Sequence, residues 1–153
     1  MSSIGYCLVK KTFSEQAFDG EGAKLYGGRW NSKGQSCIYL ASTASLAILE
    51  TMIHIENYEL LSSFVLFQIE FSSASLVALD SSLLPQDWKE DPSSISTAQI
   101  GDNWLNAGSS LGLYVPSTIL PIENNIILNP QHPDFENSLK TVKKIDFFHD
   151  SRP

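Results

Sequence analysis

Three side chains suited to binding or cleaving an anionic substrate follow one another along the chain: Arg29, Tyr39 and Glu50. Arg29 stands in "GGRWNS", between a glycine pair and a tryptophan. A guanidinium binds phosphate oxygens through two parallel hydrogen bonds, and glycine lets a ligand approach the backbone closely. Tyr39 offers a flat ring, and Glu50 offers a carboxylate that could lie at the lip of a pocket. The pattern indicates an anion held at Arg29.

Taken singly, each residue also has an ordinary structural explanation. Glutamate prefers the surface, so Glu50 is also explained as a solvated carboxylate at the edge of a helix. Tyr39 also fits a core ring whose hydroxyl reaches the rim. An isolated Arg29 is more often a surface residue or an ion-pair partner, and Ser117, after Pro116, a turn residue. Residue type alone leaves both explanations open.

Two neighbouring segments are expected to position Arg29 and Tyr39. Residues 13–36 hold five of the nine glycines together with aromatic residues, which predicts a long ordered loop carrying Arg29. Residues 36–41, "SCIYLA", are typical of a buried strand. Alternation along this strand puts Tyr39 on the face opposite to Ile38 and Leu40.

A helix over residues 43–55, capped by Ser42 or Thr43, is expected to carry Glu50. At 100° per residue, its predicted buried arc includes Met52 and Ile53, and Glu50 lies just outside that arc. The carboxylate is therefore expected at the boundary between core and solvent.

The remaining segments predict an α+β fold with few helices and an antiparallel or split, mixed sheet. A second helix is expected over 94–108, stopped by Gly108. A short helical turn and then a last strand are expected near the C-terminus. The other predicted strands are "YCLVK" near the start, 63–71, 75–80, 111–117 and 124–130.

Composition excludes several classes of protein. The 153 residues suit one domain, and a net charge of −7 disfavours nucleic-acid binding by this chain. The sequence has neither a signal peptide nor an apolar run of the roughly 18 residues that span a bilayer, so a cytoplasmic protein without a membrane contact is expected. The histidines and cysteines have no metal-binding spacing, so no metal is expected. The sequence has neither a P-loop nor a GxSxG elbow, which argues against the common NTPases and hydrolases.

The stretch "FDGEGAKLYGGRWNSKGQSCIYLASTASLAILETMIH" closely resembles RES-domain proteins, the toxins of bacterial RES–Xre toxin–antitoxin pairs. The resemblance continues through "LLPQDW", "IGDNWL", "LYVPSTILPIENNIILNPQHPDF" and the closing "FFHDSR", and so covers nearly the whole chain. It implies one RES domain over 1–153 with the ADP-ribosyltransferase fold, a split sheet around a nicotinamide dinucleotide cleft.

The resemblance also implies an activity and partners. Family members deplete NAD by cleaving its nicotinamide–ribose bond, as glycohydrolases or phosphorylases, and NAD is the expected substrate. The first alternative is a mono-ADP-ribosyltransferase that modifies a cellular protein. The second is an inactive NAD-binding or antitoxin-binding module. The expected partner is an Xre-type helix-turn-helix antitoxin, with a homodimer in the antitoxin complex expected by analogy.

Matching motif to motif puts five residues of this chain at the family's site, and the backbone N–H of Gly28, beside Arg29, is a sixth candidate. Glu50 is expected to stabilise an oxocarbenium-like ribose, Arg29 to hold the diphosphate, and Tyr39 to stack on nicotinamide. The other expected substrate-binding residues are Gly28, Ser117 and Asn129.

The first strand departs from the family pattern. Relatives often carry an arginine there, after an aromatic residue, where "GYCLVKK" has Cys7 followed by Lys10 and Lys11. Lysine lacks the planar fork of arginine. Three explanations stay open: a lysine substitutes, binding is weaker, or the match is displaced along this strand.

Overall fold

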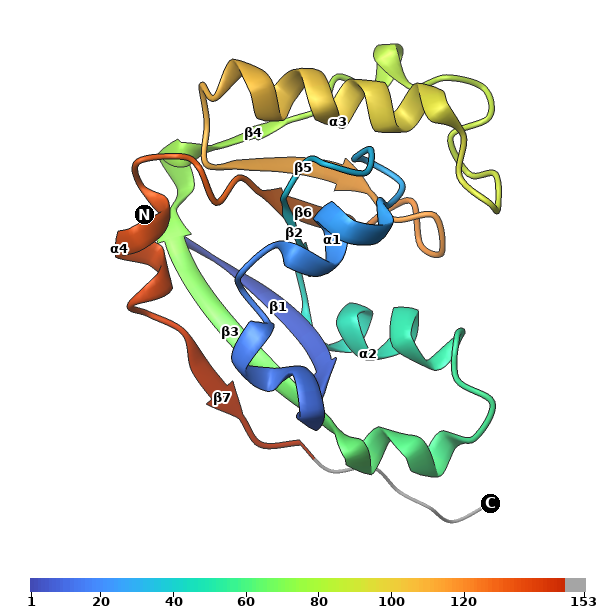
Figure 1. Ribbon diagram of the computed structural model, residues 1–153, viewed down its shortest axis with the longest axis vertical. Coiled ribbons are helices and arrows are strands. Elements are labelled where there is room, and N and C mark those ends of the chain that lie inside the picture. The colour runs from blue at the N-terminus through green and yellow to red at the C-terminus, as the bar shows by residue number, and fades with distance from the viewer. Residues whose placement is uncertain (148–153) are drawn as a thin grey trace.

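The computed structural model describes residues 1–147, apart from the side chain of Tyr58 (Figure 1). The end of the "FFHDSR" motif and His149 lie outside the described residues. Within them, one mixed sheet has the strand order β4-β5-β6-β2-β1-β3-β7. Its strands are β1 Ser2–Lys10, β2 Ile38–Ala41, β3 Phe64–Ser72, β4 Leu76–Ala78, β5 Gly112–Pro116, β6 Asn124–Leu128 and β7 Lys143–Ile145.

Helices lie on both faces of the sheet and along its edges (Figure 1). The α-helices are α1 Glu21–Tyr26, α2 Ala44–Met52, α3 Ile95–Ala107 and α4 Phe135–Leu139. Short 3-10 helices are η1 Lys11–Gln16, η2 Tyr58–Ser63, η3 Ser73–Ser75 and η4 Ser81–Leu83. No helix of the described part is both long and apolar enough to cross a bilayer.

The sheet is split between its two central strands, β1 and β2. β1 pairs with β3 along its whole length, from Ser2 opposite Ser72 to Lys10 opposite Phe64. With β2, in contrast, it pairs only where Tyr6 lies opposite Ala41. β2 pairs on its other side with β6. The two halves of the sheet are thus joined at one position and separate beyond it.

Alternation along the strands builds a core on each face. On β6, Ile126 and Leu128 belong to the cluster that includes Phe71 and Phe135, against α4. Ile127, between them, belongs to the cluster with Trp30 and Leu105 on the α3 side. A sheet covered on both faces holds its strands, and so the residues they carry, in a fixed register.

The predicted fold class is confirmed, and most predicted elements are present with ends moved by a few residues. Thr43 caps α2 by accepting the Leu46 N–H, and Gly108 ends α3 in the left-handed region. The glycine-rich segment predicted as a loop contains η1 and α1, so that prediction was wrong in part. A loop was expected there because six-residue helices have too few turns to show a periodicity.

The predicted buried arc of the Glu50 helix was wrong. α2 ends at Met52, and Met52 and Ile53 are 36% and 55% exposed. Leu46 and Ala47 are buried instead, in a cluster with Leu66 of β3. The helix packs through its first turn, because that turn follows directly on the β2 strand that anchors it.

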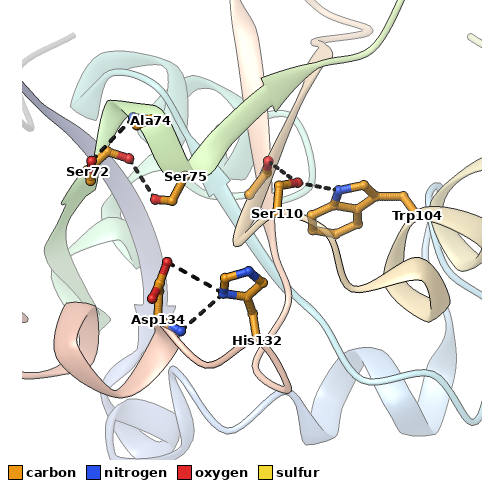
Figure 2. Close-up of polar contacts among 8 residues, drawn as sticks. Ser72, Ala74, Ser75, Trp104, Ser110, His132 and Asp134 are labelled. Carbon is orange, nitrogen blue, oxygen red and sulfur yellow. Dashed lines mark hydrogen bonds and ion pairs between the residues drawn. The ribbon is translucent and has the colours of Figure 1, made fainter.

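Side-chain hydrogen bonds hold the connections between elements, as Figure 2 shows. Trp104 of α3 donates its indole N–H to Ser110 Oγ at 2.8 Å, which fixes the chain entering β5. Ser72 accepts the Ala74 N–H and so caps η3. His132 Nδ1 accepts the Asp134 N–H at 3.1 Å before α4.

Close packing of α3 against the Arg29 turn requires a glycine. A Cβ at Gly101 would overlap the carbonyl oxygen of Trp30, which is backbone and cannot move aside alone. Asp102, the next residue, accepts hydrogen bonds from the Ser32 N–H at 2.9 Å and from Ser32 Oγ. α3 therefore positions the turn by direct backbone contact and by one carboxylate.

We expect Gly101→Ala to lower the free energy of unfolding by about 2 kcal/mol, because overpacking outweighs the better helix propensity of alanine. Thermal denaturation followed by circular dichroism measures the effect. Gly22→Ala in α1 is the matched control, since a Cβ there meets nothing within 4 Å. Equal stability of the two variants would contradict the close packing.

Candidate active site

A cavity of about 1060 Å³ lies in the split between β1 and β2. Its wall is formed by both strands, by α1 and by α2, and includes Tyr39 and Glu50. Pockets for small molecules are usually about 300–1,000 Å³, so this one is large enough for a dinucleotide. The fold therefore brings two of the predicted site residues to one cavity.

The strands leave backbone groups directed at this cavity. From Cys7 to Lys10, β1 pairs only with β3, and β2 pairs only with β6 before Ala41. In a β-strand, the N–H and C=O groups of one residue point to one edge, and those of the next residue point to the other edge. The edges at the split therefore offer donors and acceptors that no described strand uses.

Glu50 reaches the cavity from α2 and is half-buried. One carboxylate oxygen, Oε1, accepts hydrogen bonds from Asn125 Nδ2 at 3.0 Å and from Ser117 Oγ at 3.3 Å. No described residue donates a hydrogen bond to Oε2. The carboxylate is thus oriented through one oxygen, and the other is left for a ligand.

Ser117 is fully buried beside Glu50 and is not among the residues that line the cavity. Its hydroxyl oxygen accepts the N–H groups of Ile119 and Leu120, at 3.1 and 3.3 Å. Because those two bonds occupy the oxygen as acceptor, the hydroxyl proton is directed at Glu50.

Asn125 was missed by the sequence analysis. It lines the cavity from β6, and its place opposite Ala41 brings it beside α2. Its side-chain carbonyl oxygen is buried without a hydrogen-bond partner, a situation that costs about 1–3 kcal/mol. A signal was present, since polar "NN" directly precedes the apolar "IIL" of a core strand.

Tyr39 orders the turn that carries Arg29. Its hydroxyl accepts the Trp30 N–H at 3.0 Å and donates to Asn31 Oδ1 at 2.6 Å. A Cβ on Gly28 would lie 2.7 Å from that hydroxyl, so glycine is required where the turn passes the ring. The hydroxyl is engaged in the turn, and Tyr39 is among the residues that line the cavity.

Asn31 is a second residue that the sequence analysis missed. It is buried, and its amide donates to three carbonyl oxygens, those of Ala23, Ser32 and Gln35. These bonds connect α1 to the chain that follows the glycine-rich turn. Asparagine after "GGRW" was visible in the sequence, but its partners come from segments whose approach only the fold defines.

Arg29, in this turn, is not among the residues that line the cavity. Its Nη1 donates to the carbonyl oxygens of Trp88 and Glu90, both at 2.8 Å. A guanidinium has five N–H groups, so about three have no acceptor among the described residues. Arg29 therefore holds the loop around Trp88 and keeps donors available for an anion.

Asn129 lies apart from Glu50, at the other end of β6. It is buried, with Nδ2 donating to the Leu105 carbonyl at 3.1 Å and Oδ1 accepting the Gln131 N–H at 3.0 Å. It is not among the residues lining the cavity, and its described contacts connect α3 to the chain after β6.

The first strand places Lys10 and Cys7 in the wall of the cavity. Lys10 is exposed at the end of β1, where the strands have separated, and it brings a cation to the opening.

Comparisons with known proteins agree in one family. The family model described as RES domain matches residues 7–150. A "Toxin Res" from Yersinia enterocolitica is 46% identical over 96% of this chain and 97% of its own length. A "Prs ADP-ribosylating toxin" from a Sphingobium strain is 33% identical over 93% of this chain and 89% of its own.

A solved structure shares the fold. A chain in the crystal structure of the M. tuberculosis MbcT–MbcA toxin–antitoxin complex superposes with a TM-score of 0.70 at 17% identity. The match covers 95% of this chain and 82% of that one. The likeness confirms the predicted α+β split-sheet fold.

Three ionisable groups next to the split are buried in their neutral form. Burial raises the pKa of the Cys7 and Cys37 thiols from 9.0 to about 12. Burial also raises the pKa of the Tyr39 hydroxyl well above its ordinary value of 10.0, and nearby Cys37 adds to the rise. All three are protonated at neutral pH.

We expect the free energy of unfolding to fall as the pH rises above 9.0, where unfolded thiols ionise while those of the folded chain keep their protons up to about 12. The unfolded chain binds fewer protons over this range, so stability decreases with pH. Urea denaturation from about pH 8 to 11 measures the slope. A Cys7→Ala, Cys37→Ala variant should show a shallower slope, and an identical one would contradict the assignment.

Proposed function

The chain belongs to the RES domain family and is a toxin of a toxin–antitoxin system, and on that premise we propose that it cleaves NAD between nicotinamide and ribose. The observation that carries the proposal is the cavity in the split sheet, whose lining includes both Glu50 and Tyr39. The unpaired edges of β1 and β2 supply backbone groups that can hydrogen-bond the carboxamide of nicotinamide.

The bond to be cleaved suits a site without a strong acid. Nicotinamide in NAD⁺ is a pyridinium, so the electron pair of the breaking C–N bond neutralises the ring as it leaves. The ribose carbon gains positive, oxocarbenium-like charge in the transition state. A carboxylate oxygen beside the ribose stabilises that charge directly or through the ribose hydroxyls. We assign this part to Glu50 through Oε2.

Binding is assigned to groups on both sides of Glu50. The Tyr39 ring stacks on nicotinamide, and the free edges of β1 and β2 hydrogen-bond its carboxamide. Arg29 holds the diphosphate with the N–H groups it does not donate to the Trp88 loop. Lys10 adds a second positive charge at the cavity wall.

The remaining predicted residues take supporting parts in this proposal. Gly28 keeps the turn close to the Tyr39 hydroxyl, and Ser117 holds the Glu50 carboxylate in place. For Asn129, the described contacts support a part in joining α3 to the segment after β6 and none on the substrate.

The acceptor of the ADP-ribosyl group distinguishes the two candidate reactions. Water or phosphate makes the protein a glycohydrolase or a phosphorylase. The similarity to a toxin named as ADP-ribosylating supports a second candidate, transfer to a cellular protein. Both begin with the same bond cleavage, and both use the same Glu50.

A toxin that consumes NAD must be silenced in the cell that makes it. The solved neighbour lies in a toxin–antitoxin complex, which supports an antitoxin as partner of this chain. We propose an Xre-type antitoxin that contacts the operator through its own DNA-binding part and covers the cavity, with a homodimer in the complex. The cytoplasm, which holds the NAD, is the proposed place of action.

We expect purified protein to release nicotinamide from NAD, as measured by chromatography with and without phosphate. Glu50→Ala should lower turnover about a hundredfold or more with little change in KM, because the carboxylate acts mainly on the transition state. Glu56→Ala is the matched control, since Glu56 is exposed beyond the end of α2 and does not line the cavity.

The products of this experiment separate the candidates. Free ADP-ribose identifies water as acceptor, and its phosphate ester identifies phosphate. Label from NAD retained on a protein band, after incubation with a bacterial lysate, supports transfer to a protein. If NAD survives with both additions, the chain is an inactive binding module and the proposed function is wrong.

We expect Arg29→Ala to raise KM about tenfold with a smaller change in kcat, because the diphosphate is bound in the ground state as well. Arg29→Lys should recover only part of the affinity, since lysine lacks the fork. Steady-state kinetics measure both constants, and thermal melting controls for release of the Trp88 loop. A fall in kcat at unchanged KM would contradict this assignment.

A further inference from the structure

We propose that Asn125 is a positioning residue that holds Glu50 Oε1, so that Oε2 faces the ribose of the substrate. The inference rests on the proposed part of Glu50 in NAD cleavage. It starts from a single contact, the 3.0 Å hydrogen bond from Asn125 Nδ2 to Glu50 Oε1.

Chemistry fixes the direction of this contact. A carboxylate accepts hydrogen bonds and donates none, so the amide must present its NH₂ group to Glu50 and turn its carbonyl oxygen away. The Asn125 backbone is held on both sides, opposite Ala41 of β2 and opposite Val115 of β5. The amide therefore projects from a rigid inner strand, while Glu50 projects from a short helix.

The stability that the Asn125 side chain costs the fold indicates that this side chain has a functional role. The Asn125 carbonyl oxygen is buried without a partner, and the hydrogen bond to Glu50 is the side chain's one bond among the described residues. An apolar side chain of the same shape would remove the unpaired oxygen at no loss of any other described bond. Polar groups kept at a cost to stability concentrate at functional sites.

Ser117 donates to the same oxygen but serves the fold as well. Its hydroxyl also accepts the N–H groups of Ile119 and Leu120, so its removal would disturb the turn after β5. The Asn125 side chain makes no second hydrogen bond with the described residues. It is therefore the residue at which positioning of the carboxylate can be tested apart from folding.

The test compares Asn125→Leu, which keeps the shape, with Asn124→Leu, the same change on the neighbouring exposed residue of β6. We expect Asn125→Leu to lower kcat for nicotinamide release on the order of tenfold to a hundredfold, as a misplaced reacting group does. KM should stay within about threefold, because in this proposal Asn125 acts on the reaction through Glu50 and not by binding the substrate. Asn124→Leu should leave both constants unchanged.

The melting temperature distinguishes a positioning residue from a merely structural one, because loss of a structural residue would lower it together with kcat. We expect the melting temperature of Asn125→Leu to equal or exceed that of the parent protein, since the unpaired oxygen is gone. Asn125→Ala, which is smaller, serves if leucine does not fit. A melting temperature that falls together with kcat in both variants would overturn the proposal.

A double variant separates this proposal from the function on which it rests. In a Glu50→Ala background there is no carboxylate to hold, so adding Asn125→Leu should lower the residual turnover no further. An additive loss would mean that Asn125 acts independently of Glu50, and the proposal that Asn125 positions the Glu50 carboxylate would be wrong. Full activity of Glu50→Ala itself would instead overturn the proposed function.

Discussion

The site depends on one limited contact, the single antiparallel pairing of β1 with β2 at Tyr6 and Ala41. Had the two strands paired along their length, their edges would have satisfied each other and closed the sheet. Because they separate, the molecule keeps a cavity between two halves that are each firmly paired, β1 with β3 and β2 with β6. The split also leaves backbone donors and acceptors in the wall, at a place where burial would otherwise make them costly.

Two groups of polar contacts beside the split position the charged side chains. In one group, Ser117 and Asn125 hold one oxygen of Glu50 and leave the other available. In the other group, the Tyr39 hydroxyl and Asn31 hold the glycine-rich turn that carries Arg29. The first group orients a negative charge and the second supports a positive one, which matches a substrate with a cationic ring and an anionic diphosphate.

The family relationship and the geometry carry different parts of the conclusion. Matches over nearly the whole chain show a RES toxin, and the superposition on a toxin–antitoxin structure shows the fold. The oriented Glu50 carboxylate in a large cavity supports NAD cleavage.

The sequence by itself determined the fold class, most strands, both longer helices and the family. These depend on local signals: alternation in the strands, Thr43 and Gly108 at helix ends, and motifs read in chain order. Only the tertiary structure decided that Tyr39 lines the cavity while Arg29 does not, that Met52 and Ile53 are exposed, and that Asn125 bonds Glu50 and Asn31 holds the glycine-rich turn. Each of these depends on which distant segments meet, and the register of the split sheet sets that, since no spacing along the chain encodes it.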